Sequence, residues 1–135
     1  MKYREALAEA MSQAMSKENT LLIGQGVSDF KGIWGTTSGL KEKFPERVIE
    51  TPLAEDSITG ICIGASLNGM YPINTHIRAD FGLLAFNQII NLASKYKYMF
   101  GGLFEIPMLI RMVIGRSWGQ GAQHSQSLQS LLAHI

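Results

Sequence analysis

The sequence predicts an α/β domain of three layers, in which a mostly parallel sheet carries helices on both faces. Short apolar segments typical of buried strands alternate along the chain with longer segments of helical periodicity. Strands that alternate with helices form parallel sheets through right-handed crossovers. At 135 residues, with no visible internal repeat or linker, the chain is expected to be one domain.

The composition is that of an ordinary globular protein and argues against two classes of partner. Hydrophobic residues make up 46% and charged residues 17%, and the formal net charge is +1. Because Lys and Arg are scattered, we predict no nucleic-acid surface. No apolar segment approaches membrane-spanning length, and the first residues lack the apolar core of a signal peptide, so we expect a cytoplasmic protein without membrane contact.

Four elements are predicted before residue 51. Apolar side chains recur on one face of the first helix, and the strands are short apolar segments bounded by turn residues. The elements are a helix over residues 3–17, a strand over Leu21–Ile23, a helix over residues 37–44 and a strand over residues 47–50. The glycine-rich segment 24–35 between them matches no phosphate-binding motif, because no Gly-Lys-Ser/Thr follows it.

The chain is predicted to be organised around a helix that begins at Glu55. Pro52 disfavours helix in the residue before it, so the preceding strand ends in a turn. Glu55, Asp56 and Ser57 would then occupy the first helical turn, where acidic groups interact favourably with unpaired amides. Local sequence alone favours this terminal role for Glu55. The residue also stands on the carboxyl side of a strand, where open α/β sheets bind ligands.

One face of this helix is predicted to be buried. Its residues are Ile58, Ile61, Cys62 and Ala65, which recur at helical spacing. As the single cysteine in an apolar pattern, Cys62 is expected to be a buried, inert thiol. Gly60 and Gly64 each cost about 1 kcal/mol relative to Ala in a helix interior, so we expect another part of the structure to pack close to them.

Four further elements are predicted after residue 69. They are a strand over residues 73–77, a helix over residues 83–97, a strand over residues 107–113 and a last helix from about Ser125. Phe86, Ile90 and Ala93 carry the helical spacing of the second element. A glycine-rich loop precedes the last helix.

Five motifs occur in the order and near the spacing found in one family. They are Thr51-Pro-Leu-Ala-Glu55, Ala79-Asp-Phe81, Phe86-Asn-Gln-Ile-Ile-Asn91, Tyr98-Met-Phe-Gly-Gly102 and Gly121-Ala-Gln-His-Ser-Gln126. From about Tyr3 to Ile135, the chain resembles the N-terminal part of the beta subunit of thiamine-diphosphate-dependent 2-oxo acid dehydrogenases of the pyruvate, branched-chain or acetoin type. The resemblance implies a thiamine-diphosphate-binding fold. Because that subunit is well over twice as long, we expect residues 1–135 to form a single, incomplete, C-terminally truncated pyrimidine-binding domain.

The resemblance assigns roles to three residues. Glu55 matches the glutamate whose carboxylate bonds to the pyrimidine ring nitrogen of the cofactor and thereby promotes catalysis. Phe81 matches the aromatic residue that packs against the pyrimidine, although a large aromatic residue is more commonly part of the core. His124 matches a histidine at the active-site entrance that helps to handle the covalent intermediate or its acceptor. Its polar neighbours indicate exposure, and its pKa range suits proton transfer.

The resemblance also implies partners. The cofactor would be thiamine diphosphate, with its diphosphate and magnesium held by an alpha subunit through a Gly-Asp-Gly motif that is absent here. The chain would be active with that subunit in oxidative decarboxylation and acyl transfer to a lipoyl-bearing acyltransferase. No metal site is predicted on this chain, since Cys62, His76 and His124 lack ligand spacing. Exposed apolar surface at a truncated edge would favour a homodimer.

Two alternatives stay open. One is a fragment of a transketolase- or synthase-type thiamine enzyme that uses no lipoamide, although the Gln-His-Ser-Gln motif favours the dehydrogenase. The other is a non-catalytic, self-associating truncated domain. Gln25 favours the latter mildly, because it stands where the family commonly has an acidic residue in a proton-carrying connection between active sites. The family's Arg-Gly-Pro is replaced here by Arg111-Met-Val-Ile-Gly115, so we expect the substrate pocket to differ.

Overall fold

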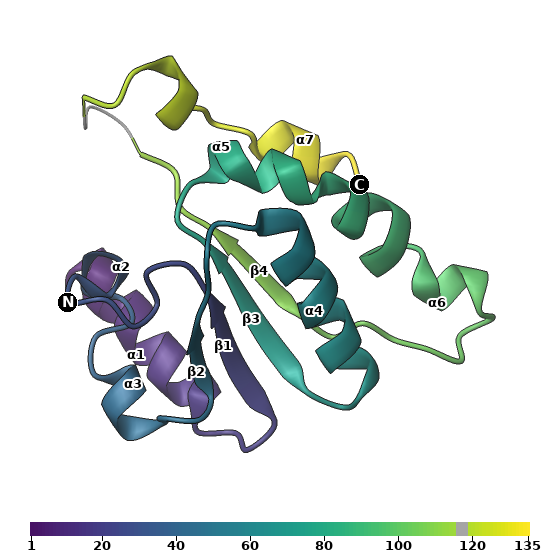
Figure 1. Ribbon diagram of the computed structural model, residues 1–135, viewed down its shortest axis with the longest axis horizontal. Coiled ribbons are helices and arrows are strands. Elements are labelled where there is room, and N and C mark those ends of the chain that lie inside the picture. The colour runs from purple at the N-terminus through teal and green to yellow at the C-terminus, as the bar shows by residue number, and fades with distance from the viewer. Residues whose placement is uncertain (116–118) are drawn as a thin grey trace.

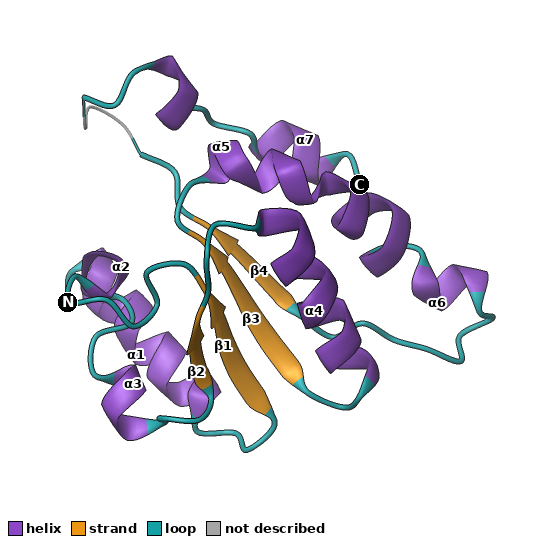
Figure 2. Ribbon diagram, viewed as in Figure 1, coloured by secondary structure: helices purple, strands orange, loops and turns teal. Residues whose placement is uncertain are grey.

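The computed structural model describes residues 1–115 and 119–135 and contains a parallel four-stranded sheet (Figure 1, Figure 2). The strands are β1 (Thr20–Gly24), β2 (Val48–Glu50), β3 (Tyr71–His76) and β4 (Leu109–Met112), in the order β2-β1-β3-β4. All three pairings are parallel, so the carboxyl ends of the strands meet at one edge. The predicted α/β class is confirmed.

Two helices of 13 residues cover the sheet, and the others are short. The long helices are α1 (Tyr3–Met15) and α4 (Glu55–Leu67). The short α-helices are α2 (Gly32–Gly35), α3 (Leu40–Lys43), α5 (Ala79–Gly82), α6 (Tyr96–Met99) and α7 (Gln129–Ala133). The described residues also form two 3₁₀ turns, η1 (Leu83–Ala85) and η3 (Ala122–His124), and a π-helix, η2 (Asn87–Ala93).

The core consists of two clusters, one on each face of the sheet. Successive residues of a strand point to opposite faces. Leu22 therefore packs with Met15 of α1, whereas Ile23 packs with Cys62 of α4. Burial raises the pKa of the Cys62 thiol to about 12, so the group stays protonated at neutral pH, and its predicted burial is confirmed.

The predicted buried face of α4 is partly wrong. Ile61 is 58% exposed, and Ile63 takes its place in the core. The buried stripe includes the polar residues Thr59 and Ser66, which a search for apolar spacing passes over. Close packing on the glycines is not seen among the described residues. A Cβ at Gly60 would make an ordinary contact with Gln88, and one at Gly64 would meet nothing within 4 Å.

The predicted helix over residues 83–97 is divided into η1, η2 and α6. Ser94 N donates to Ile89 O at 3.0 Å, a bond that spans five residues and so lengthens the turn. The residues that become buried are Ala85 and Ile89 rather than Phe86 and Ile90. Several predicted ends also move inward: the second predicted helix begins at Leu40, and the last one begins at Gln129.

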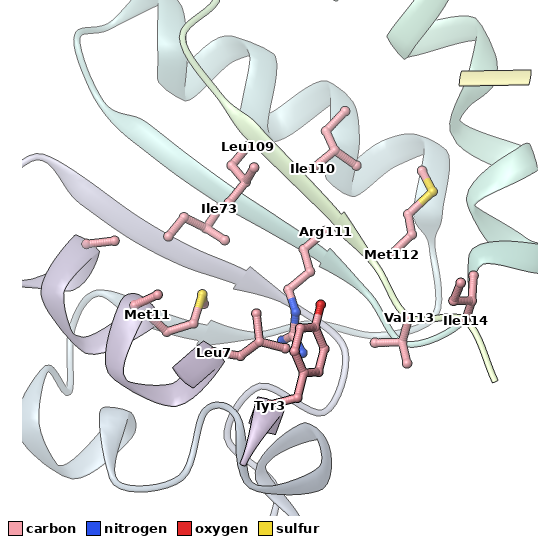
Figure 3. A pocket seen from close by; sticks show the side chains of 12 residues that line it. Tyr3, Leu7, Met11, Ile73, Leu109, Ile110, Arg111, Met112, Val113 and Ile114 are labelled. Carbon is pink, nitrogen blue, oxygen red and sulfur yellow. The ribbon is translucent and has the colours of Figure 1, made fainter. Parts of the chain in front are cut away.

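Strand β4 borders a groove of about 500 Å³ opposite α1 (Figure 3). Tyr3, Leu7 and Met11 of α1 line one side, and Leu109 and Arg111 of β4 line the other. Figure 3 shows Arg111 reaching from β4 toward Tyr3 and Leu7. Arg111 Nη2 donates to Thr36 Oγ1 at 2.8 Å, and burial lowers the pKa of the guanidinium. This edge of the sheet therefore presents apolar surface with one partly buried cation.

Candidate functional site

A second cavity, of about 480 Å³, lies at the carboxyl edge of the sheet, the position where α/β sheets bind ligands. The segments that follow β1 and β3 contribute to its wall, together with the start of α4 and the loop around η3. Its lining residues are Gln25, Leu53, Glu55, Ile77, Arg78, Phe81, Leu84, Gln120 and His124. The structure thus brings Glu55, Phe81 and His124, the three predicted site residues, to one cavity.

Glu55 is the first residue of α4, as predicted, and it is 7% exposed. The helix start places its side chain near unpaired amides and the positive end of the macrodipole, which favour a charged carboxylate. Within residues 1–115 and 119–135, no hydrogen-bond donor reaches the carboxylate oxygens. Because Glu55 lines the cavity, its carboxylate can accept a hydrogen bond from a ligand that supplies an N–H or a protonated ring nitrogen.

Phe81 and His124 form one wall of the cavity. Phe81 belongs to α5 and His124 ends η3, and their ring centroids lie 5.1 Å apart in an edge-to-face arrangement. The neighbouring Asp80 Oδ1 accepts a hydrogen bond from Gln126 N at 3.0 Å. That bond ties the His124 loop to α5, so two segments far apart in the sequence meet here.

Sequence reasoning missed Arg78 and Gln120, which also line the cavity. Arg78 Nε and Nη2 both donate to Gln120 Oε1, at 3.1 and 2.8 Å, and the guanidinium carbon lies 5.1 Å from the Trp34 ring centroid. The sequence did offer one signal for Arg78, namely its position directly after a predicted strand, at the edge of the sheet where ligands bind. Its partners lie on distant segments that no local pattern connects to it.

A buried polar cluster lies beneath the site. Asn74 Nδ2 lies 2.8 Å from Thr59 Oγ1 and 3.2 Å from His76 Nε2. Thr59 Oγ1 in turn donates to the main-chain oxygen of Glu55 at 2.7 Å. Because Asn74 Nδ2 is a donor, His76 Nε2 serves as its acceptor and the imidazole is neutral. Burial lowers the pKa of His76, and the charge of Glu55 opposes this shift.

The buried imidazole predicts that acid destabilises the chain. In the unfolded chain His76 takes up a proton as the pH falls through about 6.5, whereas the folded chain binds that proton only at lower pH. The free energy of unfolding is therefore unaffected above that pH and falls below it, by up to about 1.4 kcal/mol per pH unit. Urea unfolding between pH 7.5 and 5 measures this slope. His76→Gln should flatten it, and His134→Gln, at an exposed site, should not. Equal slopes in wild type and His76→Gln would contradict the assignment.

The glycine-rich segment after β1 binds a carboxylate of the protein itself. Glu50 accepts hydrogen bonds from the main-chain N–H groups of Gly26 and Ser28, and from the Ser28 hydroxyl at 3.0 Å. These amides are the groups that a phosphate would need. Their occupation by Glu50 agrees with the poor motif match.

The described residues offer no metal cluster and no membrane span. Among residues 1–115 and 119–135, no three His, Cys, Asp or Glu side chains are grouped so that they could hold a metal ion. In the same ranges, no helix has the length and apolar character needed to cross a membrane.

The cavity fits a flat heteroaromatic ligand. It combines a buried carboxylate, the Phe81 ring and the amide of Gln25, which is 6% exposed and whose Oε1 has no hydrogen-bond partner in the described chain. A carboxylate and an amide oxygen accept hydrogen bonds from ring N–H and amino groups, while the aromatic ring packs against a flat face. The cavity at the carboxyl edge of this parallel sheet therefore presents the groups that an aminated aromatic ring would need.

Comparison with known proteins gives the family. Residues 1–135 match the family described as "Transketolase, pyrimidine binding domain", and the chain belongs to that family. The resemblance drawn from the five sequence motifs is thereby confirmed.

The chain is also similar to curated beta subunits of pyruvate dehydrogenase and of an acetoin oxidoreductase. The chain is 37% identical over its whole length to the mitochondrial pyruvate dehydrogenase E1 component subunit beta-2 of Oryza sativa subsp. japonica. It is 38% identical, over 96% of its length, to the acetoin:2,6-dichlorophenolindophenol oxidoreductase subunit beta of Cupriavidus necator. It is 41% identical, over 97% of its length, to the pyruvate dehydrogenase E1 component subunit beta of Chaetosphaeridium globosum. The matches cover 36%, 42% and 41% of these relatives, so the chain spans about two fifths of their length.

Proposed function

We propose that this chain is the pyrimidine-binding portion of the beta subunit of a thiamine-diphosphate-dependent 2-oxo acid dehydrogenase. The observation that carries the proposal is the meeting of Glu55, Phe81 and His124 in one cavity, since the family resemblance assigned each of them to the active site. In this proposal the chain acts with an alpha subunit in oxidative decarboxylation and in acyl transfer to the lipoyl group of an acyltransferase. Similarity to pyruvate dehydrogenase and acetoin oxidoreductase beta subunits supports the assignment.

The residues of this chain would hold the aminopyrimidine half of the cofactor. Thiamine diphosphate, when bound, supplies an acidic thiazolium carbon and an electron sink for decarboxylation. The Glu55 carboxylate would accept a hydrogen bond from the protonated pyrimidine ring nitrogen, and Phe81 would pack against the ring face. The neutral Gln25 amide lies in the same cavity and offers an acceptor without charge. The diphosphate and magnesium are assigned to the alpha subunit.

Calorimetry tests the proposal directly. The chain is titrated with thiamine diphosphate and magnesium, first alone and then after mixing with a candidate alpha subunit. Binding that appears only in the mixture is the expected result, because each chain supplies half of the site. If the mixture binds no cofactor, the half-site proposal is wrong and an inert domain remains.

His124 is proposed to act at the cavity entrance, where its imidazole can exchange a proton during acyl transfer. His124→Ala in the complex should lower acyl transfer to a lipoyl acceptor by about 100-fold. Decarboxylation with an artificial electron acceptor should fall much less. His134→Ala serves as the matched control. Equal losses in the two assays would contradict this role for His124.

Self-association is a second candidate, and the groove between α1 and β4 favours it. We propose that two copies cover this surface in the absence of another partner, since Leu109 is 44% exposed at the strand edge. Sedimentation over a range of concentrations measures the association. Leu109→Lys should keep the chain monomeric, and an unchanged dimer would place the contact elsewhere.

A further inference from the structure

We propose that Arg78 binds the carboxylate of the 2-oxo acid substrate and thereby sets the substrate class of this cavity. The inference rests on the proposed function and concerns the same site. Arg78 lies directly after Ile77 at the carboxyl end of β3, and both residues line the cavity that contains Glu55. Among the described lining residues, Arg78 is the one that carries a permanent positive charge.

The guanidinium is held in a fixed position. Gln120 Oε1 accepts two hydrogen bonds from it, the main-chain oxygen of Ile77 accepts one from Nη1 at 2.9 Å, and the Trp34 ring packs over its carbon. These hydrogen-bond acceptors and the indole ring are neutral groups that orient the guanidinium, while burial lowers its pKa and the nearby charge of Asp80 opposes this shift. A fixed, planar guanidinium is well suited to a carboxylate, because its ordering cost is already met before the ligand arrives.

The backbone beneath Trp34 supports this reading. Ile33 and Trp34 have φ values of 43° and 56°, a left-handed conformation that is unfavourable for residues with a branched or bulky side chain. Strained backbone of this kind persists where the surrounding structure requires a particular side-chain position. Here the strain places an indole ring against the cation at the cavity wall.

The two charges of the cavity also orient a monoanionic substrate. The Glu55 carboxylate repels a substrate carboxylate, whereas Arg78 attracts it. A 2-oxo acid would therefore enter with its carboxylate toward Arg78, which would leave its carbonyl carbon free to meet the reactive thiazolium carbon of a bound cofactor. An uncharged ester of the same size lacks this preference.

A carboxylate contact made equally in the bound substrate and in the transition state lowers KM without raising kcat. The expected phenotype of a lost contact is thus a higher KM with little change in kcat. A role that merely supports the fold would instead reduce kcat or the amount of folded protein. This difference separates substrate binding from a structural role for Arg78.

The first experiment uses the chain without cofactor. Wild type, Arg78→Gln and Arg78→Lys are titrated by NMR with pyruvate and with methyl pyruvate, which lacks the charge. We expect pyruvate to bind wild type about 10- to 100-fold more tightly than it binds Arg78→Gln, with an intermediate value for Arg78→Lys, and methyl pyruvate to bind all three alike. Lys31→Gln is the matched control, because Lys31 is a nearby cation that does not line this cavity.

Two results of this titration would contradict a charge contact between Arg78 and pyruvate. A wild-type chain that binds the two compounds equally, or binds neither, overturns the proposal. An equal loss of both compounds in Arg78→Gln also overturns it, because the substitution would then have altered the cavity rather than removed a charge contact.

The second experiment uses the complex with the alpha subunit. Arg78→Gln should raise KM for the 2-oxo acid about 10- to 100-fold, with kcat within about threefold of wild type and unchanged affinity for thiamine diphosphate. Weaker cofactor binding with an unchanged KM would assign Arg78 to the phosphate groups and overturn the proposal. If Glu55→Gln is inactive while Arg78→Gln behaves as wild type, the proposed function stands and this inference fails. If the complex shows no dehydrogenase activity, the proposed function itself has failed.

Discussion

Glu55→Gln should lower the turnover of the complex by at least about 100-fold while the chain stays folded. Glutamine has nearly the same shape as glutamate, so it can still fill the buried position at the start of α4. Its amide carries no charge and could not stabilise positive charge on the cofactor ring that the proposal places beside it. Steady-state assays of the complex measure the loss, and circular dichroism confirms the fold.

Asp56→Asn is the matched control for this experiment. Asp56 stands in the same helical turn and undergoes the same change of charge, but it does not line the cavity. It should retain nearly full activity. Full activity in Glu55→Gln would show that the reaction does not need the Glu55 carboxylate. An equal loss in both variants would show that the turn needs acidic residues for its own stability rather than for catalysis.

Gly24→Ala should be strongly destabilising. Gly24 ends β1 beside Thr75 of β3, and an added Cβ would lie 2.1 Å from the Thr75 main-chain oxygen. Such an overlap forces the two central strands apart, and we expect a loss of about 3–5 kcal/mol in the free energy of unfolding. Because small domains have about 5–15 kcal/mol in total, much of the chain should unfold.

Urea unfolding followed by circular dichroism measures the effect, with Gly64→Ala as control. Gly64 lies inside α4 with nothing within 4 Å of an added Cβ, so its replacement should stabilise the chain by up to about 1 kcal/mol. A Gly24→Ala chain as stable as wild type would mean that β1 and β3 are not packed as closely as described.

Local signals predicted the part of the site that lies on one helix. Pro52 and the acidic residues after it predicted a helix beginning at Glu55, because proline geometry and helix-terminus electrostatics act over a few residues. The family motifs supplied Phe81 and His124, and the structure brings both to the Glu55 cavity. The roles of these residues remain predictions that the experiments above test.

Features that depend on tertiary contacts could not be predicted from local patterns. Ile61 is apolar and correctly spaced, yet the polar Thr59 occupies the sheet-facing stripe because it hydrogen-bonds within the buried cluster. The predicted helix is broken into a 3₁₀ turn and a π-helical turn, and the spacing of a regular α-helix describes neither of them. Arg78 was missed because Gln120 and Trp34, which position it, lie on distant segments.

The polar cluster on β3 leaves hydrogen-bonding groups unsatisfied inside the sheet. The central strand buries Asn74, Thr75 and His76, and Asn74 Oδ1 and Thr75 Oγ1 have no hydrogen-bond partner among the described residues. Unsatisfied buried groups of this kind lower the intrinsic stability of the sheet directly under the Glu55 cavity. A ligand that binds the folded chain alone adds stability in proportion to the logarithm of its concentration. The melting temperature of the chain should consequently rise with the concentration of a ligand or partner that binds only the folded state. A heat-denaturation curve would then measure how fully the site is occupied.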